Sequence, residues 1–170
     1  MDDPASECWL WLKNKGIVQA KYLKKVEHYL ELVGLSSHAD AYPHQLSGGM
    51  QQRGSIVRAL ITNPKILLMD EPFGAVDAQT RIVLQEMLLR IWAKFGITIV
   101  FVTHDIDEAV LLADRIVIMG VNPGHIKEIV DIPLERPRSA DSTFLDEFRQ
   151  LKLRVLTSIR EETSKLMLIA

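Results

Sequence analysis

Two adjacent carboxylates follow a short apolar run near the middle of the chain. Asp70 and Glu71 come directly after residues 66–69, which are Ile, Leu, Leu and Met. A run of this kind predicts a strand buried on both faces. Ligands of open α/β sheets bind at the carboxyl ends of parallel strands, where carboxylates can hold a divalent cation or take a proton from water. The alternative interpretation is an acidic turn after a buried strand.

A second cluster combines a hydroxyl group with two glycines. Ser47, Gly48 and Gly49 stand where a helix is predicted to begin. Two glycines allow backbone N–H groups to approach an anion closely, and the helix dipole adds partial positive charge at that end. The same residues also fit a Ser N-cap followed by flexible glycine. The local chemistry does not separate these two interpretations.

A histidine follows the second predicted strand. His104 lies between Thr103 and Asp105, just after the β-branched run 97–102. A histidine in this place is, on its own, more often a structural residue than a chemical one. The other four histidines, at positions 28, 38, 44 and 125, show no spacing typical of metal ligands.

The elements that must position these groups alternate along the chain. We expect helices over residues 5–34, 49–62, 78–95, 105–113 and 143–165, and strands over 66–69, 97–102 and 115–119. The order strand, helix, strand, helix, strand is typical of a parallel α/β sheet. A turn at 122–124 leads into a strand-like segment, 125–132, which we expect to form an antiparallel hairpin with 115–119. Asp77 is expected to cap the helix that begins at Ala78.

Composition narrows the class of protein without identifying it. The chain has 170 residues, a formal net charge of −2 and a single cysteine, Cys8. These values fit a globular protein and give no global argument for binding nucleic acid or an anionic membrane. The first residues lack the pattern of a secretion signal, and the longest apolar runs fall short of the roughly 20 residues that span a bilayer. We expect any membrane role to go through a partner.

The motifs together resemble a known family. Residues 46–53, LSGGMQQR, closely resemble the signature motif of the ATP-binding cassette (ABC) ATPases. Asp70-Glu71-Pro72 resembles their Walker B motif, His104 their switch histidine, and residues 74–77 their D-loop. Segments 121–126 and 133–138 are similar to the importer ATPases of the nitrate, sulfonate and taurine group. The resemblance extends from about Val26 to Lys165.

The resemblance implies roles in ATP hydrolysis. Asp70 would bind Mg²⁺, Glu71 would polarise the attacking water, and His104 would contact the γ-phosphate and help to hold Glu71. No G-x-x-x-x-G-K-[ST] motif occurs in the chain, and no glycine is followed by lysine. A phosphate-binding loop needs both features. We therefore expect an N-terminally truncated subunit that lacks the Walker A loop and is inactive alone.

The resemblance also implies partners. The signature residues Ser47, Gly48, Gly49 and Gln51 would face ATP bound by a second ABC ATPase subunit in a head-to-tail dimer, and Asp77 would cross that interface. The remaining partners would be transmembrane permease subunits and, indirectly, a periplasmic or extracellular substrate-binding protein, with no nucleic acid. The expected location is cytoplasmic, peripheral on the inner face of the cell membrane.

The implied fold class is α/β, a partial P-loop-NTPase-like ABC ATPase core with a parallel sheet, flanking helices and a helical subdomain. Residues 1–46 would be part of the helical subdomain, 47–138 the signature helix and the C-terminal half of the core, and 139–170 a C-terminal helix. The expected function is ATP hydrolysis for uptake of a small anion such as nitrate, sulfonate or taurine. A catalytically inactive fragment or interaction module is the alternative. A DNA-repair or translation ATPase is disfavoured, because long coiled-coil heptads and a basic stripe are absent.

Overall fold

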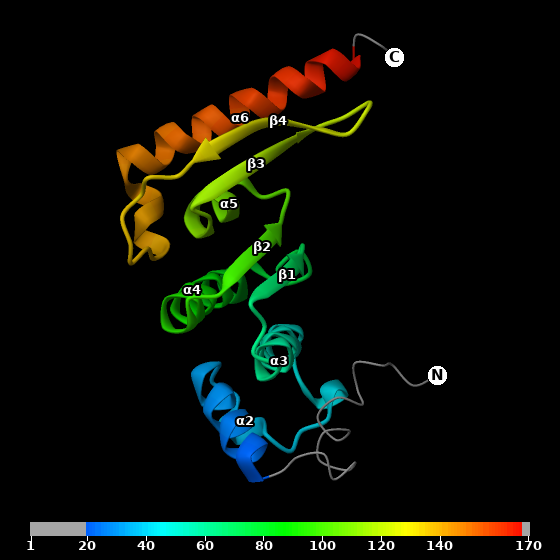
Figure 1. Cartoon of the computed structure of the whole chain (residues 1–170), viewed down its shortest axis with the longest axis vertical. Helices are drawn as coiled ribbons and strands as arrows, with labels where there is room; N and C mark the ends of the chain where they lie inside the picture. Colours follow the sequence, from blue (N-terminus) through cyan, green and yellow to red (C-terminus); the bar gives the residue numbers. More distant parts are fainter. Residues whose placement is uncertain (1–19, 168–170) are drawn as a thin grey trace. The chain divides into compact units, whose positions relative to one another are not determined.

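The computed structural model describes residues 20–167, which form helices and strands in alternation (Figure 1). The chain divides into two compact units, residues 1–100 and 101–170. Of the helix predicted over 5–34, residues 5–19 lie outside the described part. No helix among the described residues is long and apolar enough to cross a membrane.

The first unit is built mainly of helices. Its elements in chain order are α2 (Ala20–Leu32), the 3-10 turns η1 (Ser36–His38) and η2 (Pro43–Gln45), α3 (Gly48–Ile61), β1 (Ile66–Asp70), α4 (Ala78–Phe95) and the start of β2 (Thr98–Val102). Helix α3 packs against both α2 and α4. The fully buried side chains here include Val57, Phe73, Leu84 and Met87. The predicted helices over 49–62 and 78–95 are confirmed within one residue.

Glycines end two of these segments as their sequence indicates. Gly34, after α2, has φ +66°, and Gly96, after α4, has φ +58°. Both values lie in the left-handed region that favours glycine. The Gly96 N–H donates to the Trp92 carbonyl, which closes the last turn of α4. Both glycines therefore follow the ends of their helices in the left-handed conformation.

Strands β1 and β2 are neighbours and run parallel, joined by α4 (Figure 1). The prediction that β1 is buried on both faces is wrong for the described residues. Leu67 and Met69 are buried, but Ile66 is 58% and Leu68 73% exposed. Side chains alternate between the two faces of a strand, so the described residues cover one face of β1 and leave the other open.

The second unit contains α5 (Ile106–Leu112), β3 (Arg115–Gly120), β4 (His125–Asp131), the 3-10 helix η3 (Ala140–Phe144) and α6 (Asp146–Met167). Strands β3 and β4 form the predicted antiparallel hairpin, with an irregularity between Ile118 and Met119. Helix α6 packs against α5 and β3. Its first turn begins at Asp146 instead of Thr143, because residues 140–144 form a capped 3-10 turn.

One expected strand pairing is not found. The sheets of the described residues are β1–β2 and β3–β4. The third strand of the predicted parallel sheet, β3, is therefore paired with β4 alone. A short turn is enough to pair β3 with β4 in antiparallel orientation. Pairing of parallel strands, in contrast, requires a longer crossover connection.

Candidate functional site

The predicted signature residues form the first turn of α3. The Ser47 Oγ accepts a hydrogen bond from the Met50 N–H at 3.3 Å, so Ser47 is the N-cap. The Gln51 side chain donates to the Leu46 carbonyl at 3.1 Å, which ties the turn to the preceding residue. Ser47 and Gly48 are exposed. The prediction that Ser47 is an N-cap is confirmed. The N-terminus of α3 is exposed at Ser47 and Gly48, and an exposed helix N-terminus can bind an anion.

The two glycines of this turn differ in their surroundings. A Cβ atom on Gly48 would meet nothing within 4 Å. A Cβ atom on Gly49 would overlap the methyl group of Thr80, in the first turn of α4. Gly48 thus leaves open space beside the turn, whereas Gly49 is needed for close packing of α3 on α4.

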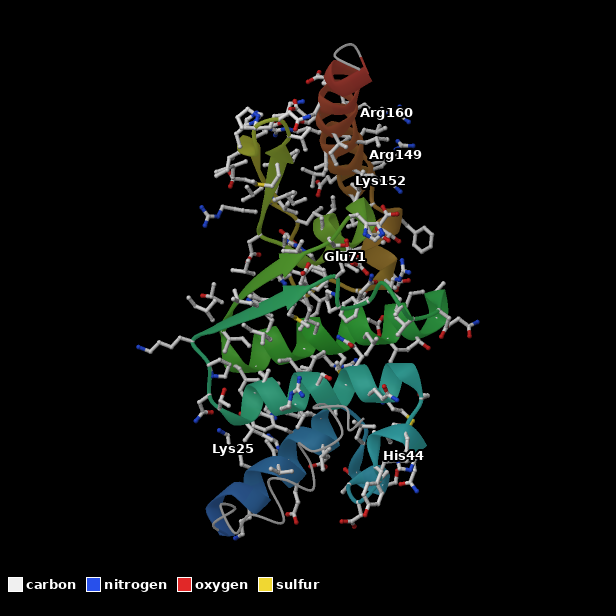
Figure 2. All side chains as sticks on the ribbon, turned by 90° about the vertical axis from the view of Figure 1, so that its right-hand side faces the viewer. Lys25, His44, Glu71, Arg149, Lys152 and Arg160 are labelled. Atoms are coloured by element: carbon white, nitrogen blue, oxygen red, sulfur yellow. The ribbon has the colours of Figure 1, made fainter. Side chains whose placement is uncertain are left out.

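The paired carboxylates lie at the end of β1, as predicted. Asp70 is the last residue of the strand, and Asp70 and Glu71 are both exposed. Glu71, labelled in Figure 2, has φ +41°, in the left-handed region. The other described non-glycine residues with positive φ are Asn63 and Asn122. Asparagine tolerates this conformation and glutamate rarely adopts it, so the backbone at Glu71 is strained.

Asp77 is the N-cap of α4. One carboxylate oxygen accepts the N–H groups of Gln79 at 3.1 Å and Thr80 at 3.0 Å, and the other accepts the Thr80 hydroxyl at 2.6 Å. The Thr80 hydroxyl, followed by the backbone N–H groups, holds the pKa of the Asp77 carboxyl below its ordinary value. The predicted cap is confirmed, and Asp77 is a carboxylate stabilised in its charged form.

His104 belongs to the second unit, whereas Glu71 belongs to the first. The residues on either side of His104 are fixed locally. The Thr103 hydroxyl donates to the buried Glu108 carboxylate at 2.8 Å and accepts the Asp105 N–H at 3.0 Å. Asp105 in turn caps α5. The predicted approach of His104 to Glu71 stays a prediction.

A buried arginine, Arg138, binds carbonyl groups at the C-terminal end of α5. Arg138 donates to the carbonyl groups of Leu111, Ala113, Ile132 and Leu134 at 2.7–3.2 Å. Burial, and secondarily the charge of Arg136, lower the pKa of Arg138. The Arg136 guanidinium pairs with Asp114 at 2.7 Å. These contacts tie the segment after β4 to the end of the helix that follows His104.

The donor set at Asp70 can be compared with what Mg²⁺ requires. The described residues contain no group of three or more His, Cys, Asp or Glu side chains that could hold a metal ion. Mg²⁺, however, is usually bound by one or two carboxylates together with waters and substrate phosphates. An exposed aspartate at a strand end fits that mode of binding, in which the ion arrives with its phosphate ligand.

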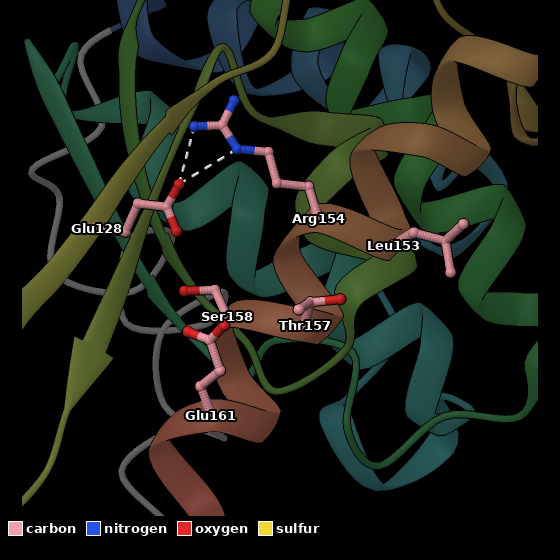
Figure 3. Close-up of a pocket in the computed structure, with 6 residues that line it drawn as sticks. All are labelled: Glu128, Leu153, Arg154, Thr157, Ser158 and Glu161. Atoms are coloured by element: carbon pink, nitrogen blue, oxygen red, sulfur yellow. Dashed lines mark hydrogen bonds and ion pairs between the residues drawn. The ribbon is translucent and has the colours of Figure 1, made fainter.

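The second unit also has an open groove between β4 and α6 (Figure 3). Its lining residues are Glu128, Leu153, Arg154, Thr157, Ser158 and Glu161. Arg154 donates to Glu128 at 2.8 Å across it. None of the predicted site residues lines this groove. Its other charged lining residue, Glu161, forms an ion pair with Lys127 at 3.2 Å.

Comparison with known proteins finds similarity to ABC transporter proteins. The sequence profile of the ABC transporter family matches residues 6–74. An ABC transporter ATP-binding protein of Methanocaldococcus jannaschii, itself uncharacterized, is 49% identical over 154 residues, which is 91% of this chain and 57% of that protein. An aliphatic sulfonates import ATP-binding protein of Bacillus cereus is 50% identical over 131 residues, 76% of this chain and 52% of its own length.

The chain is therefore similar in sequence to ABC transporter ATP-binding proteins over most of its own length. It spans about half the length of the curated relatives that it matches. The dimeric structure of a bacterial ABC transporter cassette is 35% identical, with a TM-score of 0.55 over 66% of this chain and 47% of that chain. An inward-facing ABC transporter described as of the metal-chelate type has a TM-score of 0.65 at 20% identity over 78% of this chain and 55% of that chain, and it supports the ABC ATPase fold alone.

Sequence reasoning did not find three residues that support the site. Thr80 contacts both Gly49 and Asp77, Glu108 holds Thr103 beside His104, and Arg138 secures the end of α5. Glu108 and Arg138 are buried, which is rare for charged residues and is not indicated by residue type. The only sequence signal for Thr80 is its place three residues after an N-cap aspartate.

Proposed function

We propose that this chain supplies the signature turn, the paired carboxylates and the switch histidine of an ATP-hydrolysing subunit of an ABC importer. The observation that carries the proposal is the strained backbone of Glu71, immediately after the strand that ends in Asp70. Strain of this kind persists where the surrounding structure imposes it, and it gathers at active sites. The matches to ABC transporter proteins agree with this interpretation.

The proposed chemistry assigns one task to each group. Glu71 accepts the proton of the water that attacks the γ-phosphorus, and a positioned general base contributes typically 10²–10⁴ in rate. His104 donates a hydrogen bond to the γ-phosphate and helps to orient Glu71. Asp70 is the protein ligand of Mg²⁺. The ion, when bound, neutralises charge on the phosphate oxygens.

The signature turn is proposed to act on a second subunit. Ser47, Gly48, Gly49 and Gln51 would face ATP held by the partner in a head-to-tail dimer, with the Ser47 hydroxyl and the helix N-terminus directed at its phosphates. Asp77 would lie at the same interface. The open space beside Gly48 supports this role, because a ligand could approach the backbone there.

Substrate and assembly are inferred from the relatives. The printed names of several relatives at 50% identity specify import of aliphatic sulfonates. A small sulfonate-like anion is therefore the proposed cargo, carried by permease subunits, with the chain peripheral on the cytoplasmic face of the membrane. The segments 1–46, 47–138 and 139–170 keep their proposed roles as helical subdomain, second half of the core and C-terminal helix.

A catalytically inactive fragment or interaction module is the second candidate. Two observations favour it: the sequence contains no Gly–Lys pair, and the exposed face of β1 carries Ile66 and Leu68. Without a phosphate-binding loop the chain lacks the backbone donors and lysine that grip the β- and γ-phosphates. On this view the chain takes part in assembly and does not turn over ATP alone.

The test uses a chimera that joins this chain to the part of the M. jannaschii relative that the match leaves uncovered. Phosphate release by the chimera is compared with that of Glu71→Gln, which removes the charge and the basicity but keeps the size. Glu147→Gln, at an exposed position in the first turn of α6, is the matched control. We expect Glu71→Gln to lose about 10²–10⁴ in rate and the control to match the parent. Turnover of Glu71→Gln within about threefold of the parent, under ~1 kcal/mol in barrier, would rule out Glu71 as the base.

A further inference from the structure

Two helix N-termini meet in the first unit. Helices α3 and α4 lie side by side (Figure 2), and Gly49 and Thr80 lie in their respective first turns. Gly49 is buried although Ser47 and Gly48 beside it are exposed. A Cβ atom at Gly49 would overlap the Thr80 methyl carbon and lie 3.8 Å from its Cβ. The signature turn therefore rests directly on the Thr80 side chain.

The hydroxyl group of Thr80 contacts Asp77. Its hydroxyl donates to one Asp77 carboxylate oxygen at 2.6 Å, and its N–H donates to the other at 3.0 Å. Thr80 thus contacts the signature turn with its methyl group and the Asp77 cap with its hydroxyl group. Gly49 and Asp77, which are 28 positions apart in the sequence, thus contact the same side chain.

The geometry of threonine links these two contacts mechanically. Both branches are attached to the same Cβ atom, so a rotation about the Cα–Cβ bond that moves one branch also moves the other. In helices threonine divides between two χ1 rotamers. The hydrogen bond to Asp77 selects the rotamer that places the methyl group on Gly49. A shift of Gly49 must consequently strain or break the hydrogen bond to Asp77, and the reverse also holds.

We propose that Thr80 is a positioning residue that couples the signature turn to the Asp77 loop, so that displacement of either segment is transmitted to the other. The functional meaning of this coupling rests on the proposed function, in which both segments face the partner's nucleotide. The coupling itself is a property of the chain without ligand. It is tested on the 170-residue chain in the absence of nucleotide, so its outcome is independent of whether the chimera hydrolyses ATP.

The experiment perturbs the signature turn and reads the response at Asp77. The carboxyl titration of Asp77 is followed by NMR in the parent, in Gly49→Ala and in Gly48→Ala. Gly49→Ala displaces Thr80, so we expect the Asp77 pKa to rise toward its ordinary value of about 3.9. Gly48→Ala meets nothing within 4 Å and is expected to leave the titration unchanged. An unchanged Asp77 pKa in folded Gly49→Ala would overturn the coupling.

Two substitutions at Thr80 test the reverse direction and remain informative if Gly49→Ala does not fold. Thr80→Val keeps a branched apolar side chain but loses the hydroxyl group, and Thr80→Ser keeps the hydroxyl group but loses the methyl group. We expect Thr80→Val to raise the Asp77 pKa and also to speed hydrogen exchange at the Met50 N–H by severalfold, since the methyl contact is no longer held. Thr80→Ser should keep the low Asp77 pKa while exchange at Met50 rises. If Thr80→Val changes Asp77 alone, the two contacts are independent and the proposal is wrong.

Discussion

At position 71, glycine is expected to give a more stable chain than alanine, although both substitutions remove the proposed catalytic group. Glu71 has φ +41°. The left-handed conformation destabilises an L-residue by roughly 1–2 kcal/mol through steric crowding at Cβ. Glycine avoids this steric cost but loses more backbone entropy on folding, about 0.5–1 kcal/mol relative to alanine. The midpoints of these two ranges differ by about 0.75 kcal/mol, and glycine is predicted to be favoured over alanine at position 71 by about that amount.

The assay is urea unfolding of Glu71→Gly and Glu71→Ala. Both variants lose the same side-chain interactions of Glu71 beyond Cβ, so their difference isolates the backbone conformation. With a slope of about 2 kcal/mol/M, the glycine variant should unfold at a urea midpoint about 0.25–0.5 M above the alanine variant. Glu71→Gln keeps the strain and provides a second reference. Equal midpoints for glycine and alanine, or a lower one for glycine, would refute the strain at this residue.

Three further predictions follow from the same structure. Isothermal titration of the 170-residue chain with Mg-ATP should show weak binding, because the sequence has no Gly–Lys pair to grip the phosphates; a dissociation constant in the micromolar range would contradict this. The exposed apolar face of β1 should make the chain associate in size-exclusion chromatography, and Leu68→Lys should shift it toward monomer; a parent that elutes as a clean monomer with a sharp melting transition would count against the idea. Since the folded Asp77 pKa is lowered, its contribution to stability is present above the unfolded pKa and is lost as pH falls through the folded pKa. Unfolding of Asp77→Asn should therefore depend less on pH between about pH 5 and 2 than unfolding of the parent, and identical pH profiles would exclude this role.

Local sequence signals predicted most of the helical framework. Ser47 and Asp77 begin helices as N-caps, and Gly34 and Gly96 end segments in left-handed conformation. Each of these outcomes depends on a few neighbouring residues, so residue type carries the information. The placement of Asp70 at the end of β1 followed from the same kind of local pattern.

Features that depend on packing between distant segments could not be predicted. The contact of Gly49 with Thr80 exists because α3 packs against α4, and no local pattern reports that approach. Leu68 is exposed although the apolar sequence of β1 predicted burial on both faces. The burial of a strand depends on which other segments cover it, and the strand's own sequence does not show this. The conformation of Glu71 was also missed, because glutamate is not a residue that favours positive φ.

Nucleotide-dependent dimerisation of the Glu71→Gln chimera tests the central claim most directly. The claim is that the signature turn at Ser47 and the carboxylates at Asp70 and Glu71 complete ATP sites between two copies. Because the variant should bind ATP without hydrolysing it, size-exclusion chromatography with light scattering is expected to show a dimer in Mg-ATP and a monomer in Mg-ADP. Ser47→Arg, which places a large side chain in the signature turn, should abolish the dimer. A Glu71→Gln chimera that stays monomeric in saturating Mg-ATP would contradict the account.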